Sequence, residues 1–196
     1  MKAKFLTGYE LELIRQATKP EHWLPFALAL ETGLRVGDVA KIKKSDIFEE
    51  NGYFFVDFVA NKTKKHGKAQ ISEQLAKALA QPNGSAWAFP SPKDKTKHIT
   101  RQALHARIKS ACERAHVSAN GVSPHSMRKN FAVELYRKEG ITAVARALQH
   151  SNISTAELYA LADWISGENA KRPLLREDLP RIIEAVKEAL DKEFNL

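Results

Sequence analysis

The amino-acid sequence predicts a mostly α-helical fold of the α+β class with one small antiparallel sheet. Apolar residues recur at helical spacing along most of the 196 residues, in stretches that start at capping residues or stop at glycines. Residues 53–60 (YFFVDFVA) differ, because they are rich in aromatic and β-branched residues and are typical of a strand. The sequence has no internal repeat and no low-complexity segment, so its length suits one sizeable domain with its own core.

The ends of the helices are marked by local signals. Thr7 and Glu10 have the spacing of a capping box, which predicts a first helix starting near residue 8. A second helix is expected from about residue 20 to residue 31, stopped by Gly33, and a short third helix from residue 35 to residue 42. The other predicted helices cover about residues 72–80, 100–116, 124–139 (ended by Gly140), 141–149 and 154–162.

The strand at residues 53–60 is expected to form a hairpin. The polar run NKTKKHGK follows it, and residues 69–71 can form a short return strand. The tip of this hairpin is therefore crowded with lysines.

The last part of the chain differs from the rest. Residues 163–196 form a linker and a predicted amphipathic helix, at about residues 177–193, and we separate them from a first domain at residues 1–162. The apolar face of this helix must be buried somewhere, either on its own domain or on a neighbouring protomer, and we favour the neighbour slightly. The residues of that face are Leu179, Ile182, Ile183, Val186 and Leu190.

The charge of the chain is uneven. Its 31 basic and 23 acidic residues give a net charge of +8, of which residues 1–162 carry +10 and residues 163–196 carry −2. Basic residues gain affinity for a polyanion by releasing its counterions, which favours a nucleic acid as partner. A well-solvated basic surface would have the same composition, so charge alone leaves both interpretations open.

Several other classes of protein are disfavoured. No apolar run approaches the ~20 residues that span a bilayer, and the N-terminus has no signal-peptide pattern. The single cysteine, Cys112, excludes an internal disulfide and lies in a helical apolar pattern typical of a core. The histidines have no metal-ligand spacing and no glycine-rich phosphate loop is present, so we expect no metal and no cofactor. The expected location is the cytoplasm.

Three motifs could carry chemistry, although each is unspecific alone. Arg35 lies in TGLRVGDVAKIKKSDI, where an isolated arginine is usually a surface charge. His125 and Arg128 lie in SPHSMRKNFAVEL, three residues apart near a helix start, which is common on solvated helices. His150 and Tyr159 lie in ALQHSNISTAELYA, where the tyrosine could simply be half-buried in the core.

Taken together and in this order, the motifs resemble the catalytic domain of the tyrosine recombinase (phage integrase) family over residues 5–162. The resemblance implies the fold of the DNA breaking-rejoining enzymes. It also implies a site-specific DNA recombinase of phage or mobile-element type that needs neither metal nor ATP. Such an enzyme cleaves and rejoins DNA through a 3′-phosphotyrosine. A type IB topoisomerase, which rejoins the same strand, and a DNA-binding module without catalysis are the alternatives.

The resemblance also implies roles for the motif residues. Tyr159 matches the nucleophile, and Arg35 and Arg128 match the arginines that bind the scissile phosphate. Arginine suits this task because its guanidinium is always charged and forks onto phosphate. His125 matches the proton acceptor, and His150 matches a residue that hydrogen-bonds the phosphate in the transition state.

The implied general acid is a lysine at the hairpin tip. Lys64 has the usual spacing to the end of the hairpin, if Ser72 replaces the usual proline, whereas Lys62 with Thr63 copies a common Lys-Thr pair. We favour Lys64, keep Lys62 as the alternative, and place Lys65 third.

Asp38 occupies the family's acidic position, where a carboxylate holds the active-site arginine and histidine, although it could also complement the start of a helix. Gln149 departs from the family, because it stands where a glycine is usual.

The partners implied are double-stranded DNA and further copies of the chain. We expect a monomer in dilute solution, a tetrameric synapse on DNA and association with the nucleoid of a bacterial or phage host. An accessory DNA-bending protein is among the partners that the resemblance allows. Family members usually carry a helical DNA-clamping domain before the catalytic domain, so the choice of target site is not expected to be readable from these residues.

Overall fold

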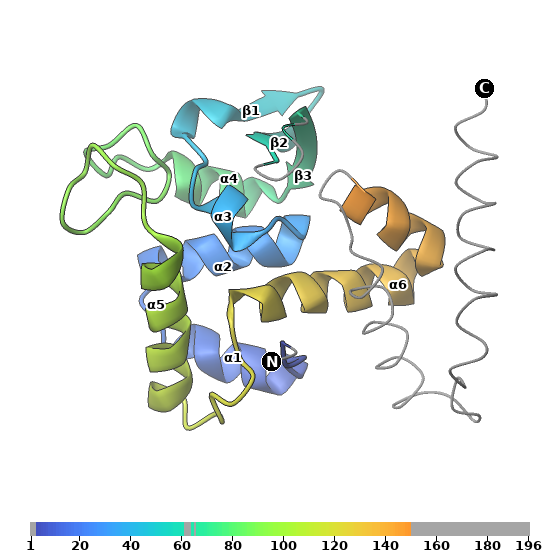
Figure 1. Cartoon of the computed structure of the whole chain (residues 1–196). Coiled ribbons are helices and arrows are strands. Elements are labelled where there is room, and N and C mark those ends of the chain that lie inside the picture. The colour runs from blue at the N-terminus through green and yellow to red at the C-terminus, as the bar shows by residue number, and fades with distance from the viewer. Residues whose placement is uncertain (1–2, 61–63, 65, 150–196) are drawn as a thin grey trace. The chain divides into compact units, whose positions relative to one another are not determined.

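The predicted fold class is confirmed by the computed structural model, which describes residues 3–60, 64 and 66–149 (Figure 1). Contacts divide the chain into two compact units, Met1–Phe131 and Ala132–Leu196. The elements in chain order are α1 (Gly8–Gln16), α2 (Pro20–Thr32), α3 (Val36–Val39), the 3₁₀ turn η1 (Lys44–Asp46), β1 (Ile47–Glu50), β2 (Tyr53–Val59), β3 (His66–Ile71), α4 (Glu73–Ala80), α5 (Arg101–Arg114) and α6 (Pro124–Gln149).

The start of α1 and both ends of α2 lie where the local sequence signals predict. Thr7 Oγ1 accepts a hydrogen bond from Glu10 N at 3.2 Å, and the Glu10 carboxylate accepts one from Thr7 N at 3.0 Å, so the capping box forms. Helix α2 begins at Pro20, and Gly33 follows its last residue in the left-handed conformation, with φ of 65°. Glycine adopts this conformation without the steric cost of a Cβ.

The sheet contains one strand more than the predicted hairpin. Its order is β1-β2-β3, with antiparallel pairing throughout, and β3 begins three residues earlier than expected, at His66. Strand β1 pairs with β2 through the two-residue turn Asn51-Gly52, whose φ angles are 53° and 79°. An Asn-Gly pair with both residues at positive φ is the favoured short hairpin turn, so the sequence did contain the signal for β1.

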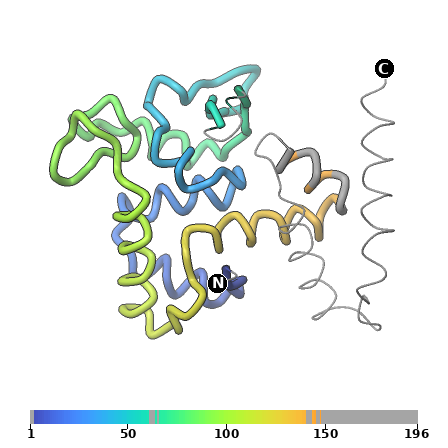
Figure 2. The backbone as a smooth tube through the Cα atoms, in the orientation of Figure 1, coloured from blue at the N-terminus to red at the C-terminus, as the bar shows by residue number. Residues whose placement is uncertain are grey.

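Helix α2 is central to the first unit. It contacts β3, α3 and α4, while α4 packs against β1 and β2. Figure 2 shows α2 running between the sheet and α1. One continuous core extends from the N-terminal segment to the start of α6, and its largest fully buried side chains include Leu6, Ile14, Phe26, Leu28, Ile42, Val56, Leu79, Ile99, Leu104, Ile108 and Met127.

The predicted helix end at Gly140 is wrong. Helix α6 runs without interruption from Pro124 to Gln149, crossing from the first unit into the second. A glycine inside a helix costs only about 1 kcal/mol relative to alanine, which favourable neighbours can offset. In the second unit, Ala132, Val133 and Val144 are buried. The helices expected at residues 154–162 and 177–193 lie outside the described residues.

In the part of the chain that the structure describes, no helix has the length and apolar character needed to cross a membrane.

The hairpin of β2 and β3 depends on a glycine. Phe58 pairs with Gly67 across the two strands, and a Cβ on Gly67 would lie 2.5 Å from the Phe58 ring. We expect Gly67→Ala to lower the free energy of unfolding by about 1–3 kcal/mol, because the ring or a strand must move. Urea unfolding followed by circular dichroism measures this change.

Gly8→Ala is the matched control, because a Cβ at Gly8 meets no atom within 4 Å. It should be neutral or slightly stabilising. Equal stability of Gly67→Ala and the wild type would contradict the packing described here.

Candidate active site

The last turn of α2 shapes the backbone that leads to Arg35. Thr32 Oγ1 donates to Leu28 O at 2.6 Å and accepts from Leu34 N at 3.3 Å, which ties the residue after Gly33 back to the helix. Leu34 is buried, so its side chain anchors the segment in the core. Arg35 therefore follows a turn that is fixed by both hydrogen bonds and packing.

Arg35 directly precedes α3 and is half-buried. It is the N-cap of this short helix, and its carbonyl accepts from Asp38 N at 2.8 Å and Val39 N at 2.9 Å. Asp38 is only 4% exposed, in the first turn of α3, where a carboxylate complements the helix dipole. The acidic position predicted beside Arg35 thus lies on the same helical turn.

Arg128, near the C-terminal end of the first unit, contacts the turn that precedes Arg35. It is 5% exposed, and its Nη1 donates to the carbonyl of Gly33, two residues before Arg35. Consecutive Cα atoms are about 3.8 Å apart, so the backbones of Gly33 and Arg35 are within about 7 Å of each other. One nitrogen of each guanidinium, Nη1 of Arg35 and Nη2 of Arg128, is buried. Two such cations on adjoining segments favour an anionic ligand.

His125 lies one turn before Arg128 and is exposed. The start of α6 is held by Ser126 N, which donates to Ser123 O at 2.8 Å, and by Ser126 Oγ, which accepts from Ser123 N at 3.2 Å. The predicted pair therefore forms part of one helical segment, with the arginine buried and the histidine accessible.

Lys64 lies on the loop that joins β2 to β3. It is exposed and adopts a φ of 58°, and its backbone N–H donates to the carbonyl of the buried Ala60 at 2.7 Å. Lys62 and Lys65, the other candidate lysines, lie outside the described residues, as do His150 and Tyr159. The structure thus brings together the segments of Arg35, Asp38, His125 and Arg128, and places Lys64 on the hairpin tip.

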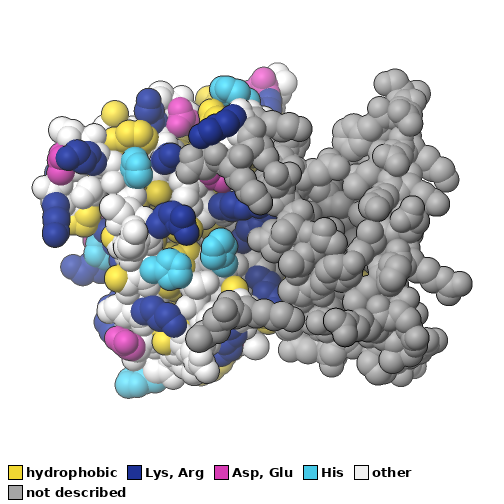
Figure 3. Space-filling model, viewed as in Figure 1, with side chains coloured by type: hydrophobic (Ala, Val, Ile, Leu, Met, Phe, Trp, Pro, Cys, Tyr) yellow, Lys and Arg dark blue, Asp and Glu magenta, His cyan; other side chains and the backbone are white. Residues whose placement is uncertain are grey.

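Basic side chains and histidines gather over α3, α5 and the start of α6 in the view of Figure 3. Helix α5 contributes Arg101, His105 and Lys109, which are spaced four residues apart on one side of the helix. Burial lowers the pKa of His105, and the charges of Arg101 and Lys109 lower it further. The lowered pKa disfavours the charged form of His105, so the fixed charge of this helix face comes from Arg101 and Lys109.

Cys112 is poorly suited to act as a nucleophile. It is fully buried in the core, as predicted, and burial raises the pKa of its thiol. Within the described ranges, no group of three or more His, Cys, Asp or Glu side chains could hold a metal ion.

Comparison with known proteins identifies the family. The model of the phage integrase family matches residues 4–164. The chain belongs to the phage integrase family. The matched span includes every position from Arg35 to Tyr159 that the sequence motifs single out.

Two relatives illustrate the range of this family. The chain is 28% identical to the tyrosine recombinase XerD of Agrobacterium fabrum over 153 residues, which are 67% of this chain and 46% of that protein. It is 28% identical to the integrase of Escherichia phage P2 over 157 residues, which are 80% of this chain and 42% of that protein. The chain therefore covers less than half the length of either relative.

Solved structures of the family share the fold. A lambda integrase (75–356) dimer bound to a COC′ core site matches with a TM-score of 0.69 and 18% identity, over 89% of this chain and 64% of that chain. The XerH recombinase bound to its difH substrate matches with a TM-score of 0.63 and 18% identity, over 94% of this chain and 55% of that chain. The lambda integrase catalytic core matches with a TM-score of 0.62 and 20% identity, over 76% of this chain and 99% of that core.

One departure from the family pattern has a structural counterpart. Ser72 stands at the end of the hairpin, where a proline is usual in the family, and it caps α4 by accepting from Leu75 N at 3.2 Å. Its backbone N and its Oγ also donate to the two carboxylate oxygens of Glu31, at 2.7 and 2.9 Å. A proline has neither donor, so both of these bonds between the hairpin and the last turn of α2 would be absent with the usual proline. Glu31 was not recognised from the sequence, because no local signal marks a contact across 41 residues.

Proposed function

We propose that this chain is the catalytic domain of a site-specific DNA recombinase of phage or mobile-element type. It cleaves and rejoins double-stranded DNA through a 3′-phosphotyrosine. The observation that carries the proposal is the bond from Arg128 to the carbonyl of Gly33, because it joins the His-x-x-Arg segment to the segment of Arg35. Membership of the phage integrase family, whose match extends to residue 164, supports it.

The proposed reaction conserves the energy of the phosphodiester. The phenol oxygen of Tyr159 attacks the scissile phosphorus, a bond forms between them, and the bond from phosphorus to the 5′-oxygen breaks. The proton of the phenol passes to His125, and the departing 5′-oxygen receives a proton from Lys64. Rejoining is the reverse, with a 5′-hydroxyl as the attacking group, so neither ATP nor a metal is consumed.

The two arginines would hold the phosphate during both steps. Charge builds up on the non-bridging oxygens in the transition state, and a preorganised guanidinium stabilises it without rearranging at that moment. Asp38 would keep Arg35 in place from the first turn of α3, and His150 would donate a hydrogen bond to the same phosphate.

The nucleophile is tested first. Tyr159→Phe should bind DNA with wild-type affinity and form no covalent adduct, because only the attacking oxygen is lost. A nicked suicide substrate and a denaturing gel measure the adduct. Tyr9→Phe on α1 is the matched control, since Tyr9 is 75% exposed. An adduct in the Tyr159→Phe variant would show that another residue is the nucleophile.

A DNA substrate with a better leaving group distinguishes the general acid from the other lysines. Lys64→Ala should cleave ordinary DNA slowly, and a substrate with sulfur at the 5′-bridging position should restore its rate, because a thiolate leaves without a proton. Lys77→Ala on α4, an exposed lysine paired with Glu73, is the control and should cleave both substrates normally. Sulfur rescue of Lys62→Ala in place of Lys64→Ala would transfer the role to Lys62.

Assembly on DNA is proposed from the family. Structures of the lambda integrase include a dimer on a core site and a tetramer on a Holliday junction. For this chain we propose a monomer in dilute solution and a tetrameric synapse on DNA, in the cytoplasm and associated with the nucleoid. An accessory DNA-bending protein would assist where the site must be bent.

The proposed division into a catalytic domain, residues 1–162, and a tail, residues 163–196, leads to a test of assembly. If the apolar face at residues 177–193 docks on a neighbouring protomer, deletion of residues 173–196 should spare cleavage of a single site and abolish recombination between two sites. Gel assays of both reactions with the same preparation measure this. Loss of single-site cleavage or of folding would mean that the helix packs on its own domain.

A further inference from the structure

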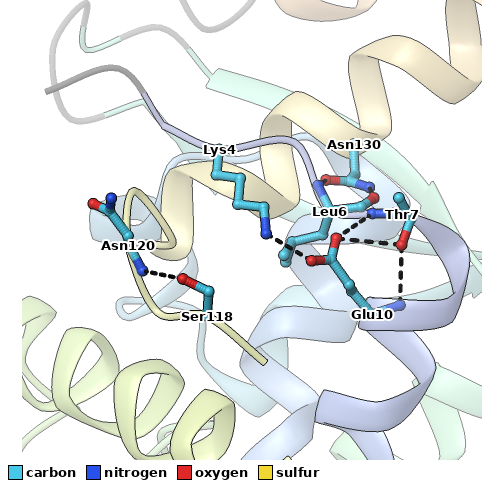
Figure 4. A network of polar contacts seen from close by, with 7 residues as sticks. All are labelled: Lys4, Leu6, Thr7, Glu10, Ser118, Asn120 and Asn130. Carbon is cyan, nitrogen blue, oxygen red and sulfur yellow. Dashed lines mark hydrogen bonds and ion pairs between the residues drawn. The ribbon is translucent and has the colours of Figure 1, made fainter. Parts of the chain in front are cut away.

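Asn130 joins the start of α6 to the N-terminal segment of the chain (Figure 4). Its side-chain oxygen accepts from Leu6 N at 3.1 Å, and its side-chain nitrogen donates to Leu6 O. The two residues are 124 positions apart in the sequence. Asn130 is 3% exposed and Leu6 is fully buried, so these bonds are formed away from water.

The amide of Asn130 matches the backbone of Leu6 as a neighbouring strand would. An asparagine side chain offers one acceptor and two donors, and here both kinds of group meet the two backbone groups of a single residue. Alanine at this position would leave a buried N–H and a buried C=O of Leu6 without these bonds. A second contact holds the same segment, because Lys4 N donates to Gly121 O at 2.9 Å just before α6.

This clamp lies two residues after Arg128. The guanidinium of Arg128 is held at its tip by the Gly33 carbonyl, and the helix that carries it is held by Asn130. The direction of a long side chain is defined only when both its tip and its backbone are fixed. Without Asn130, the first turns of α6 could shift while the guanidinium stayed tethered.

We propose that Asn130 is a positioning residue for cleavage: it fixes the backbone of α6 so that Arg128 meets the scissile phosphate in a productive geometry. The inference rests on the proposed function and goes beyond it, since Asn130 touches neither the phosphate nor the nucleophile. A displacement of about 1 Å in a reacting group can cost about 100-fold in rate.

The first experiment separates cleavage from binding. Asn130→Ala should reduce the single-turnover rate of adduct formation at saturating DNA by about 10-fold or more. The dissociation constant for DNA should change by less than about twofold, because the charges that bind the backbone remain. Asn120→Ala is the matched control: Asn120 lies in the neighbouring loop, is exposed, and uses its backbone N–H to bond Ser118 Oγ (Figure 4).

A double-mutant cycle tests whether the effect passes through Arg128. If Asn130 acts by placing this guanidinium, Asn130→Ala should cost much less in an Arg128→Lys background, where the forked contact is already lost. A general loss of stability would instead give multiplicative effects on the rate. Multiplicative effects would therefore overturn the inference.

Asn130→Asp provides a readout in pH and a second variant if Asn130→Ala folds poorly. Its ionised carboxylate can accept from Leu6 N but cannot donate to Leu6 O, whereas its protonated form can do both. Burial raises the pKa of such a carboxyl, so its neutral form returns as the pH falls. The cleavage rate of Asn130→Asp relative to wild type should therefore rise as the pH is lowered, and that of Asn130→Ala should not.

The outcomes distinguish this inference from the proposed function. If the wild type forms no covalent adduct, the proposed function fails and the inference fails with it. If the wild type forms the adduct and Asn130→Asp shows a pH-independent deficit, or either variant loses DNA affinity in proportion to its rate, the function stands and the positioning role is wrong.

Discussion

The candidate site depends on the hydrogen bond between Arg128 and the carbonyl of Gly33. It links residues 95 apart in sequence, and it supplies a partner to a guanidinium that is 5% exposed. A buried cation is costly unless its donors are engaged, so the bond fixes where α6 can begin. The acceptor belongs to a glycine with φ of 65°, which turns the chain toward Arg35. The same turn therefore sets the direction of one arginine and receives the other.

The turn at the end of α2 also receives the hairpin. Glu31 accepts from both donors of Ser72, the residue directly after β3. Glu31 lies two residues before Gly33, whose carbonyl binds Arg128. Two segments that are distant in sequence, the end of the hairpin and the start of α6, thus converge on residues 31–33, directly before Arg35. This convergence agrees with the position of α2, which contacts β3, α3 and α4. Each segment carries part of the proposed chemistry, so a disturbance of this one turn would affect both arginines and the lysine hairpin together.

Features that depend on neighbouring residues could mostly be predicted from the sequence, whereas contacts between residues distant in the sequence could not. Elements with local signals were predicted well, such as the capping box of Thr7 and the αL glycine that ends α2. Strand β1 was missed although Asn51-Gly52 is a local signal, and Gly140 was given too much weight, because a single glycine does not end a helix with favourable neighbours. The resemblance to the family identified candidate site residues, but spacing alone does not decide between Lys62 and Lys64. The contacts of Glu31 and Asn130 could not be predicted, because nothing in their local sequence specifies a distant partner.

The candidate cations differ in how firmly they are held, and this difference suits the proposed reaction. Arg128 is fixed at its tip by Gly33 and through its helix by Asn130, so its charge has a defined place before the proposed DNA substrate binds. A group that stabilises a transition state gains most from such preorganisation. Lys64 is exposed on the loop between β2 and β3, and the contacts described for this hairpin hold its backbone: the Lys64 N–H donates to Ala60 O, Phe58 packs on Gly67, and Ser72 binds Glu31. A general acid must reach an oxygen that moves as its bond to phosphorus breaks, and a lysine on a flexible stem at a hairpin tip can follow that movement. The firmly held Arg128 and the exposed Lys64 therefore suit, respectively, the phosphate that stays in place and the oxygen that departs in the proposed reaction.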